Sequence, residues 1–442
     1  MTQPETAADP PTEATRRPRI LLLFGPTSYR TGAFLAAAER LAIDVDRGYD
    51  LPRPLADYWG VPLSLPFADP DAAVAAVLAH AESHPIDAIV AVDDGATLIA
   101  ARASAALGLP HNDPAAALAA QDKFVMRERL AAAGVPVPTY RLWPLSTDPL
   151  AAAFATAFPC VVKPRHLSGS RGVIRADNPE QFVDAWQRTR RLLLAEGADP
   201  LDGTLLVERY LPGVEVALEG LLTNGALRTL ALFDKPDPLE GPFFEETIYT
   251  TPSRLPVGMQ HAITTRAAEA ATALGLRHGP VHAEFRINDA GVWPIELAGR
   301  SIGGLCASVL EFGAGIGLEE LILRHAVGLP LPAPPRAGEA AGVMMIPIPR
   351  AGLLRAVDGQ DDARSVPGIT GLQISAPLNH PLVPLPEGAS YLGFIFARTA
   401  SPEAAERALR EAHARLRIRI APILSLIPIE TSGPARGAAL HV

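Results

Sequence analysis

Short apolar runs alternate with amphipathic segments in the N-terminal part of the chain. Two apolar runs of strand length and three segments of helical spacing follow one another, at residues 19–24, 31–41, 71–82, 86–92 and 97–107. Buried strands that alternate with helices are typical of a parallel α/β sheet. We therefore expect an N-terminal parallel α/β domain over residues 18–118.

Strand and helix patterns continue to about residue 330. Residues 120–134 are amphipathic and end at Gly134, so they predict one helix. Further helices are predicted at residues 179–196, 262–274 and 317–327. Strands are predicted at residues 158–163, 173–176, 205–210, 215–222, 281–288 and 292–297. Residues 234–256 hold five prolines and predict a long mobile loop.

The two ends of the chain differ from this central region. Residues 1–17 are rich in Pro, Thr and acids and have no apolar stretch, which predicts a disordered tail rather than a signal peptide. The Pro-rich residues 329–337 indicate a boundary. Beyond it, strand patterns at residues 342–348 and 391–398 and a helix pattern at residues 402–417 predict a small α+β module over residues 335–430.

Charge and composition exclude several function classes. The net charge is −9 and no basic tract is present, which argues against nucleic acid as a partner. No apolar run reaches the roughly 18 residues of a membrane helix, so no membrane partner is expected. Cys160 and Cys306 cannot form a disulfide framework. A cytoplasmic enzyme is the default expectation.

Lysine is rare in this chain and its positions are informative. Of 39 basic residues only three are Lys, namely Lys123, Lys163 and Lys235. Where Arg serves as the general surface charge, a Lys is favoured where a compact ammonium group is needed. Lys163 ends a predicted strand and precedes the Ser/Gly loop 168–172, whose N–H groups can approach phosphate oxygens. Alone, such a loop is most often a plain hairpin.

Acidic residues complete an ordered set. Glu208 and Glu215 flank a Pro-Gly turn, and Glu284 and Glu296 lie on two strands joined by a predicted hairpin. Alternation places Glu284 and Glu296 on one face, where like charges are unfavourable without a cation. Carboxylates of this kind suit Mg²⁺.

In this order the motifs resemble the ATP-grasp family from about residue 119 to 330, with the small lobe at about residues 139–212. The resemblance implies an ATP-grasp fold, α/β and α+β in class, with an N-terminal parallel α/β domain, a two-lobed nucleotide-binding region and a small C-terminal module. It implies ATP contacts from Lys123, Lys163, Ser168, Gly169, Ser170, Val207, Glu208, Arg209, Tyr210, Leu211 and Glu215. It also implies Mg²⁺, with Mn²⁺ as an alternative, at Glu284 and Glu296, and a substrate carboxylate or acylphosphate at Arg300.

One position departs from the common pattern. Many ATP-grasp proteins have Glu-x-Asn-x-Arg at the second metal acid, whereas this chain has Ala298 between Glu296 and Arg300. This puts the second-metal geometry in doubt. Glu-x-Ala-x-Arg also occurs in the L-amino acid ligase branch, which residues 335–428 resemble more loosely.

Several residues keep two interpretations each. Glu245 and Glu246 either bind the amine of a substrate or solvate the loop, and Lys235 either reaches a phosphate or a carboxylate. Asp94, beside Asp93, is either a supplementary metal or substrate ligand, or part of a turn. His282 is either a general base or a core histidine. Gly303 and Gly304 either donate N–H groups to a substrate oxyanion or form a turn.

The predicted activity is ATP-dependent formation of an amide between two amino acids or analogues through an acylphosphate, with Arg300, Lys235 and His282 as catalytic residues. The rivals are an ATP-grasp ligase of a non-amino-acid carboxylate and a nucleotide-binding protein without turnover. Small amino-acid or carboxylate substrates are the expected ligands, and a homodimer is the expected assembly.

Overall fold

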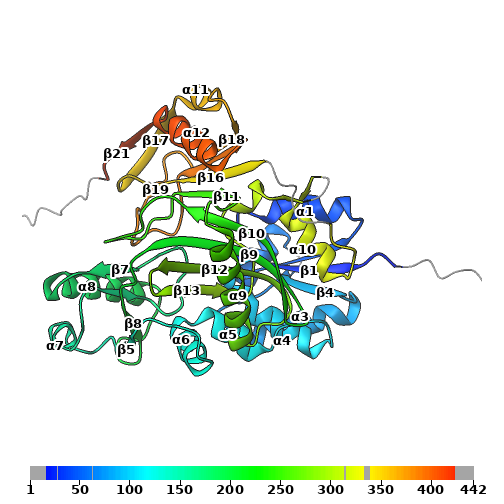
Figure 1. Ribbon diagram of the computed structural model, residues 1–442. Helices are drawn as coiled ribbons and strands as arrows, with labels where there is room; N and C mark the ends of the chain where they lie inside the picture. Colours follow the sequence, from blue (N-terminus) through cyan, green and yellow to red (C-terminus); the bar gives the residue numbers. More distant parts are fainter. Residues whose placement is uncertain (1–15, 27, 62, 313–314, 333–338, 424–442) are drawn as a thin grey trace, which may run out of the picture.

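The computed structural model describes residues 16–26, 28–61, 63–312, 315–332 and 339–423. The expected tail over residues 1–17 therefore lies almost wholly outside the described residues, as do parts of the expected boundary 329–337 and of the module 335–430. Figure 1 shows the N-terminal domain in blue and cyan and the C-terminal residues in orange and red, with a sheet between them. No helix among the described residues is long and apolar enough to cross a membrane.

The N-terminal domain has the predicted parallel sheet. Its strands pair in the order β3-β2-β1-β4, all parallel. The elements are β1 (Arg19–Phe24), α1 (Thr31–Arg40), β2 (Asp44–Tyr49), α2 (Arg53–Trp59), β3 (Leu63–Ser64), α3 (Pro70–Ser83), β4 (Ala88–Ala91) and α4 (Thr97–Ala106). The sequence pattern missed β2, whose residues DVDRGY are mostly polar and only partly buried. Hydrogen bonds to the apolar strand β1 make this segment a strand.

The small lobe is a four-stranded sheet in the order β5-β8-β6-β7 with two helices. Its elements are β5 (Tyr140–Pro144), α7 (Pro149–Phe154), β6 (Cys160–Lys163), β7 (Ile174–Ala176), α8 (Pro179–Ala195) and β8 (Thr204–Arg209). Trp143, Phe182 and Trp186 pack edge to face or tilted between sheet and helix. In Figure 1 this lobe, with α7 and α8, lies to the side of the central sheet.

A second, eight-stranded sheet forms the centre of the molecule. Its order is β13-β12-β9-β10-β11-β16-β20-β18. The α-helices and strands between residues 107 and 332 that lie outside the small lobe are α5 (Pro114–Gln121), α6 (Lys123–Ala132), β9 (Val214–Thr223), β10 (Ala226–Lys235), β11 (Ile248–Thr251), α9 (Val257–Leu274), β12 (Gly279–Asn288), β13 (Gly291–Ala298), β14 (Glu311–Phe312), β15 (Ile316–Gly317) and α10 (Leu318–Ala326). The hairpin β12–β13 turns at Asp289-Ala290, as the alternation predicts.

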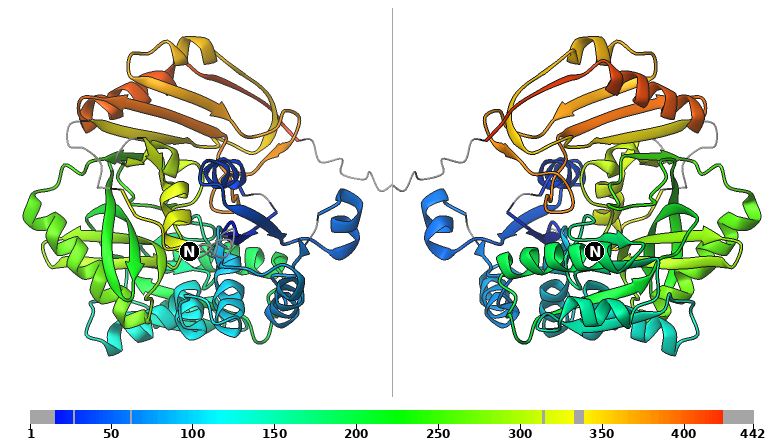
Figure 2. Two further views of the ribbon diagram at one scale, coloured as in Figure 1. Left: turned by 90° about the vertical axis from the view of Figure 1, so that its right-hand side faces the viewer. Right: turned by 90° about the vertical axis from the view of Figure 1, so that its left-hand side faces the viewer.

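The C-terminal module shares this large sheet. Its elements are β16 (Ala340–Ile346), β17 (Gly352–Asp358), α11 (Gln360–Arg364), β18 (Ile369–Ile374), β19 (Pro381–Leu382), β20 (Gly393–Thr399), α12 (Pro402–Ala414) and β21 (Arg417–Ala421). β16 pairs with β11 over four residues, so the sheet continues across the expected domain boundary. Figure 2 shows the module, in yellow-orange to red, as the upper layer of the molecule.

The structure shifts one sequence prediction of local structure and overturns another. The helix expected over residues 120–134 is α6 over Lys123–Ala132, because Asp122 leaves the helical conformation and its carboxylate accepts from the Phe124 N–H, which starts this helix. The loop expected over residues 234–256 contains β11, a central strand of the large sheet. Its residues Ile248 and Tyr249 are buried, so the proline count outweighed a real strand signal in the prediction.

The stability of the fold should depend on pH because of two histidines, His278 and His325, that lie near β4 and α4. His325 packs on His278 at 4.8 Å between ring centroids, and its Nε2 is 2.9 Å from Thr223 Oγ1. Burial, and then the charge of His278, lower the pKa of His325 from 6.5 to about 4. The unfolded chain therefore takes up the proton first, so stability is complete above about pH 6.5 and is lost as the pH falls toward 4.

We expect His325→Gln, which keeps a partner for Thr223, to remove part of this loss. Urea unfolding at pH 7.5 and pH 5 measures it. The stability difference between the two pH values should be about 1 kcal/mol smaller in the variant, after allowance for the partial exposure of the ring. An unchanged difference would contradict the assignment.

Candidate nucleotide and substrate site

A cavity of about 460 Å³ lies where the N-terminal domain, the small lobe, the large sheet and the C-terminal module meet. Most residues singled out from the sequence line it. They are Asp94, Lys123, Lys163, Ser168, Gly169, Ser170, Glu208, Arg209, Tyr210, Leu211, Glu215, Glu246, His282, Glu284, Glu296, Arg300, Gly303 and Gly304. Residues more than 200 positions apart in the chain thus share one space.

Three predicted residues do not line the cavity: Val207, Lys235 and Glu245. The Val207 side chain packs in the small-lobe core with Trp143 and Phe182. Glu245 and Glu246 are adjacent in the chain, and only Glu246 lines the cavity.

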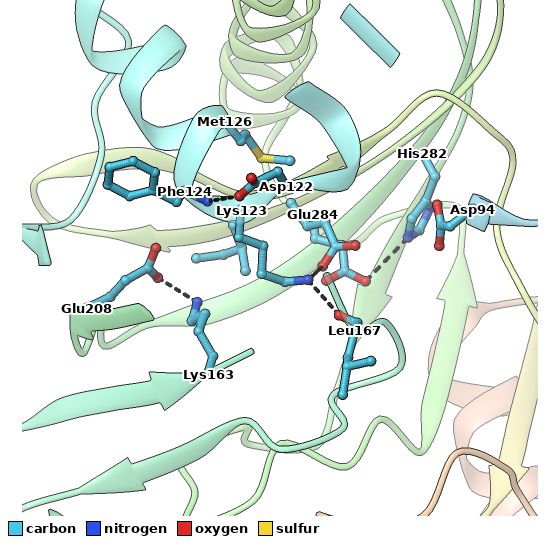
Figure 3. Close-up of polar contacts among 12 residues, drawn as sticks. Asp94, Asp122, Lys123, Phe124, Met126, Lys163, Leu167, Glu208, His282 and Glu284 are labelled. Atoms are coloured by element: carbon cyan, nitrogen blue, oxygen red, sulfur yellow. Dashed lines mark hydrogen bonds and ion pairs between the residues drawn. The ribbon is translucent and has the colours of Figure 1, made fainter. Parts of the chain in front are cut away.

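Lys163 enters the cavity from the end of β6. Its Nζ donates to Glu208 Oε2 at 2.5 Å, and Arg127 Nε donates to Glu208 Oε1 at 2.7 Å. Burial opposes ionisation of Glu208, but the two cations outweigh it and lower the pKa of this carboxyl to about 2. Glu208 is therefore ionised near neutral pH and holds the Lys163 ammonium group, and Figure 3 shows this contact.

Lys123 approaches from the first turn of α6, on the opposite side. Its Nζ donates to the Leu167 carbonyl at 2.7 Å, and lies 3.5 Å from Glu296 Oε2. Asp122, which precedes it, also forms an ion pair with Arg165 on the small lobe. Because Asp122 caps the start of α6, Lys123 is the first residue of this helix and extends into the cavity.

Glu284 and Glu296 face each other across the hairpin β12–β13. They are paired residues in the strand register, and both line the cavity. Two carboxylates at adjacent positions of a half-buried surface match the oxygen ligands that Mg²⁺ prefers. The residues therefore fit a magnesium site. Asp94, the third metal candidate, lines the same cavity, and its carboxylate accepts from Arg300 Nη2 at 2.5 Å.

Lys235 joins three carboxylates instead of pointing toward open space. Its Nζ donates to Glu215 at 2.7 Å, to Glu284 at 3.0 Å, and to Glu246. Burial disfavours the ammonium ion, but the three acids outweigh it and raise the Lys235 pKa. Of the two alternatives left open for this lysine, the structure has the carboxylates, and they are the protein's own.

The same cluster changes the view of Glu215 and Glu246. Glu215 also accepts from Arg286 Nε at 2.7 Å, so its carboxylate has two protein cations in this structure. Burial, and then the charge of Glu284, raise the Glu246 pKa. Glu246 is thus the acid of this cluster for which an additional positive group would be most favourable.

His282 lies between two acids. Its Nδ1 is 2.5 Å from Glu219 Oε1, and its Nε2 is 3.3 Å from Glu284 Oε1. Burial disfavours the imidazolium, but Glu219 outweighs it and raises the His282 pKa to about 9. The ring is therefore positively charged near neutral pH, which opposes a general-base role in this state and suits contact with a phosphate.

Sequence reasoning missed two buried residues that hold this site together. Arg127 is fully buried and donates to Glu208 and to the Ile295 carbonyl at 2.7 Å. Glu219 accepts from His282 and from the Ile302 N–H at 3.1 Å. The sequence signal for both was a charged residue on an otherwise apolar strand or helix face. Such a residue is rarely buried unless it has a partner, so it points to a buried ion pair or hydrogen bond.

An apolar wall faces the acids and Arg300. It consists of Tyr29, Tyr249, Ile302, Cys306, Met345 and Tyr391. Cys306 Sγ contacts Met345 Sδ at 3.6 Å, and Tyr29 and Tyr391 both pack on the ring of Phe394. These residues come from five separate segments of the chain, so no local motif indicates them.

Comparisons with known families agree with this arrangement. Residues 156–309 match the ATP-grasp domain family, residues 36–111 match the ATP-grasp N-terminal domain, and residues 344–421 match the L-amino acid ligase C-terminal domain 2. A D-alanine–D-alanine ligase of Aromatoleum aromaticum is 30% identical over 36% of this chain and 49% of its own. An uncharacterized protein of Sinorhizobium fredii is 25% identical over 72% of this chain.

The chain spans 65% and 49% of the length of these two relatives, so it matches only part of each. Similarity to a solved structure is more extensive. The crystal structure of an L-amino acid ligase from Bacillus licheniformis matches 92% of this chain and 100% of its own, with a TM-score of 0.75 and 25% identity. With its N-terminal, nucleotide-binding and C-terminal parts all matched, this chain belongs to the ATP-grasp superfamily.

Proposed function

We propose that this protein is an ATP-dependent ligase that joins two amino acids, or close analogues, through an amide bond and releases ADP and phosphate. The observation that carries the proposal is the convergence of Lys123, Lys163, Glu284, Glu296 and Arg300 on one cavity. Transfer of a phosphoryl group to a carboxylate brings two anions together, and only a dense set of cations makes that approach favourable.

In the first proposed step, a carboxylate oxygen of one amino acid attacks the γ-phosphorus of ATP, and the bond from that phosphorus to ADP breaks. Lys123, Lys163 and protonated His282 all line the cavity, where their charges would offset the negative charge of the transferring phosphoryl group. Mg²⁺ held by Glu284 and Glu296 would neutralise phosphate charge and orient the nucleotide when bound. Arg300 would hold the carboxylate or the acylphosphate.

In the second proposed step, the amine of the other amino acid attacks the acyl carbon and phosphate leaves. The attacking amine loses a proton as the amide bond forms. Gly303 and Gly304 also line the cavity, and their N–H groups would stabilise an oxyanion in this step.

The apolar wall indicates the class of one substrate. A ligand whose carboxylate meets Arg300 and whose ammonium group meets Glu246 would place its side chain against Tyr249, Cys306 and Met345. Such a wall favours an apolar or aromatic side chain over a charged one. We therefore propose an amino acid with an apolar side chain as one of the two substrates.

A coupled ADP assay over pairs of amino acids, with mass spectrometry of the products, tests the function. ADP release that depends on two amino acids and yields a dipeptide-like amide is the expected result. Release of AMP and pyrophosphate would refute it, and ADP release with a non-amino-acid carboxylate alone would favour a different ligase.

Gly303→Val tests the substrate wall. Gly303 lines the cavity, and a Cβ at this position would meet no atom within 4 Å, so the added side chain fills open space. We expect kcat/KM for large apolar substrates to fall about tenfold or more relative to alanine. An equal loss for large and small substrates would contradict the assignment of the wall.

A further inference from the structure

A loop of the C-terminal module, residues 384–391, contacts the small lobe beside its Ser/Gly loop. The Gly172 N–H donates to the Pro386 carbonyl at 2.8 Å, and Arg171 Nε donates to the Glu387 carbonyl at 3.2 Å. Arg188 on α8 donates two hydrogen bonds of 2.9 Å to the Glu387 carboxylate. The 384–391 loop is thus bound to both the Ser/Gly loop and the helix behind it.

Gly172 has little freedom at this contact. Its φ is +67°, and a Cβ would lie 2.8 Å from Pro164 Cγ, so only glycine fits without displacement. Its carbonyl accepts from Thr189 Oγ1 at 3.0 Å, while its N–H is held by Pro386. Because both the N–H and the carbonyl of Gly172 are hydrogen-bonded, the position of the preceding residues Ser168, Gly169 and Ser170 is restricted.

The same loop also reaches the substrate end of the cavity. Ala389 and Tyr391 line the cavity, close in sequence to the residues that hold the small lobe. The turn at Gly388, which separates Glu387 from Ala389, is tight, because a Cβ on Gly388 would lie 1.9 Å from the Val383 carbonyl oxygen. A compact turn transmits a displacement at one end to the other.

The relative placement of the lobes decides whether the reacting groups meet. Lys163 and the Ser/Gly loop belong to the four-stranded sheet of the small lobe, whereas Glu296 and Arg300 belong to the large sheet and the segment after it. These two sheets share no strand, so contacts outside the sheets fix their separation, among them the Asp122–Arg165 ion pair and the contacts of the 384–391 loop. An error of about 1 Å in such a placement can lower a rate about a hundredfold.

We propose that Glu387 is a positioning residue for the proposed reaction, holding the Ser/Gly loop over the phosphates of ATP through its carboxylate, which binds Arg188 on α8 behind the loop, and its carbonyl, which binds Arg171. This rests on the proposed function only in taking ATP as the ligand of that loop. Glu387 itself touches no reactant. The 384–391 loop thereby links the nucleotide end of the cavity to its apolar wall.

Charge reversal tests this role. Glu387→Arg places a cation against Arg188, and Arg188→Glu with Glu387→Arg restores an opposite pair. Glu196→Arg is the matched control, because Glu196 forms a 2.7 Å ion pair with the same Arg171 but lies within the small lobe. Glu387→Gln is a milder second variant, in case the reversal disturbs folding.

The measurements are the ATP dissociation constant by calorimetry, KM for ATP, kcat and the melting temperature. We expect Glu387→Arg to weaken ATP binding and raise KM about tenfold, Glu387→Gln about threefold, and the double variant and Glu196→Arg less than twofold. Because Arg188 and Glu387 are 36% and 42% exposed, the Glu387→Arg effect should shrink in high salt. Melting temperatures should stay similar.

Two results would overturn the inference: ATP binding by Glu387→Arg equal to that of the unmodified protein, or an equal loss in Glu196→Arg. Both are read from ATP binding, which needs no amide product. Failure of the unmodified protein to make any amide while it still binds ATP would instead refute the proposed function and leave this test intact.

Discussion

Glu296→Gln should lower ADP release by a factor of about 10³ or more at millimolar Mg²⁺. The substitution keeps the shape of the side chain but removes one of the two facing carboxylate charges, so both the proposed metal site and the ion pair with Lys123 are lost. Only Lys123 contacts the Glu296 carboxylate through an ion pair among the described residues, so the fold should tolerate the amide.

Asp289→Asn is the control for this variant. Asp289 lies at the exposed turn of the same hairpin, and its loss of charge should change the rate less than twofold. Steady-state ADP release as a function of Mg²⁺ concentration measures both variants. If Glu296→Gln kept more than a tenth of the rate at saturating Mg²⁺, the metal assignment would be wrong.

Arg300→Met should lower kcat about 10³-fold while the ATP dissociation constant changes less than about threefold. The guanidinium lines the cavity where we propose that the substrate carboxylate binds, so its charge should matter most when the carboxylate acquires a phosphoryl group. Its partner Asp94 keeps 31% of its side chain exposed, so water can solvate the carboxylate that the variant leaves behind.

Arg277→Met provides the comparison, because Arg277 is exposed on the same domain and its substitution should change neither kcat nor the ATP dissociation constant. Single-turnover phosphate release and calorimetric ATP binding separate the two quantities. An equal loss of ATP affinity and kcat in Arg300→Met would assign this arginine to the nucleotide rather than to the substrate.

Local patterns carried much of the architecture. The parallel N-terminal sheet followed from apolar strands that alternate with helices, and the hairpin of Glu284 and Glu296 followed from period-two alternation around a turn. Both are consequences of backbone geometry within a few residues. Where the local signal was weak or misleading, as in the polar strand β2 and the proline-rich stretch around β11, long-range pairing decided the structure.

The candidate site shows the same division. The rarity of lysine drew attention to Lys123, Lys163 and Lys235, and two of these line the cavity. Nothing in the sequence separated the third, whose ammonium group is enclosed by three acids from β9, the 235–248 connection and β12. The charged state of His282 was equally hidden, because it depends on Glu219, 63 residues away.

The sequence by itself determined which chemical groups are available and which strands carry them, because periodicity and residue type are local properties. Only the tertiary structure decided which charges neutralise one another, how the C-terminal module extends the large sheet, and that residues 384–391 meet the Ser/Gly loop. Those outcomes depend on distances between segments up to hundreds of residues apart, which are set by the packing of whole sheets and lobes.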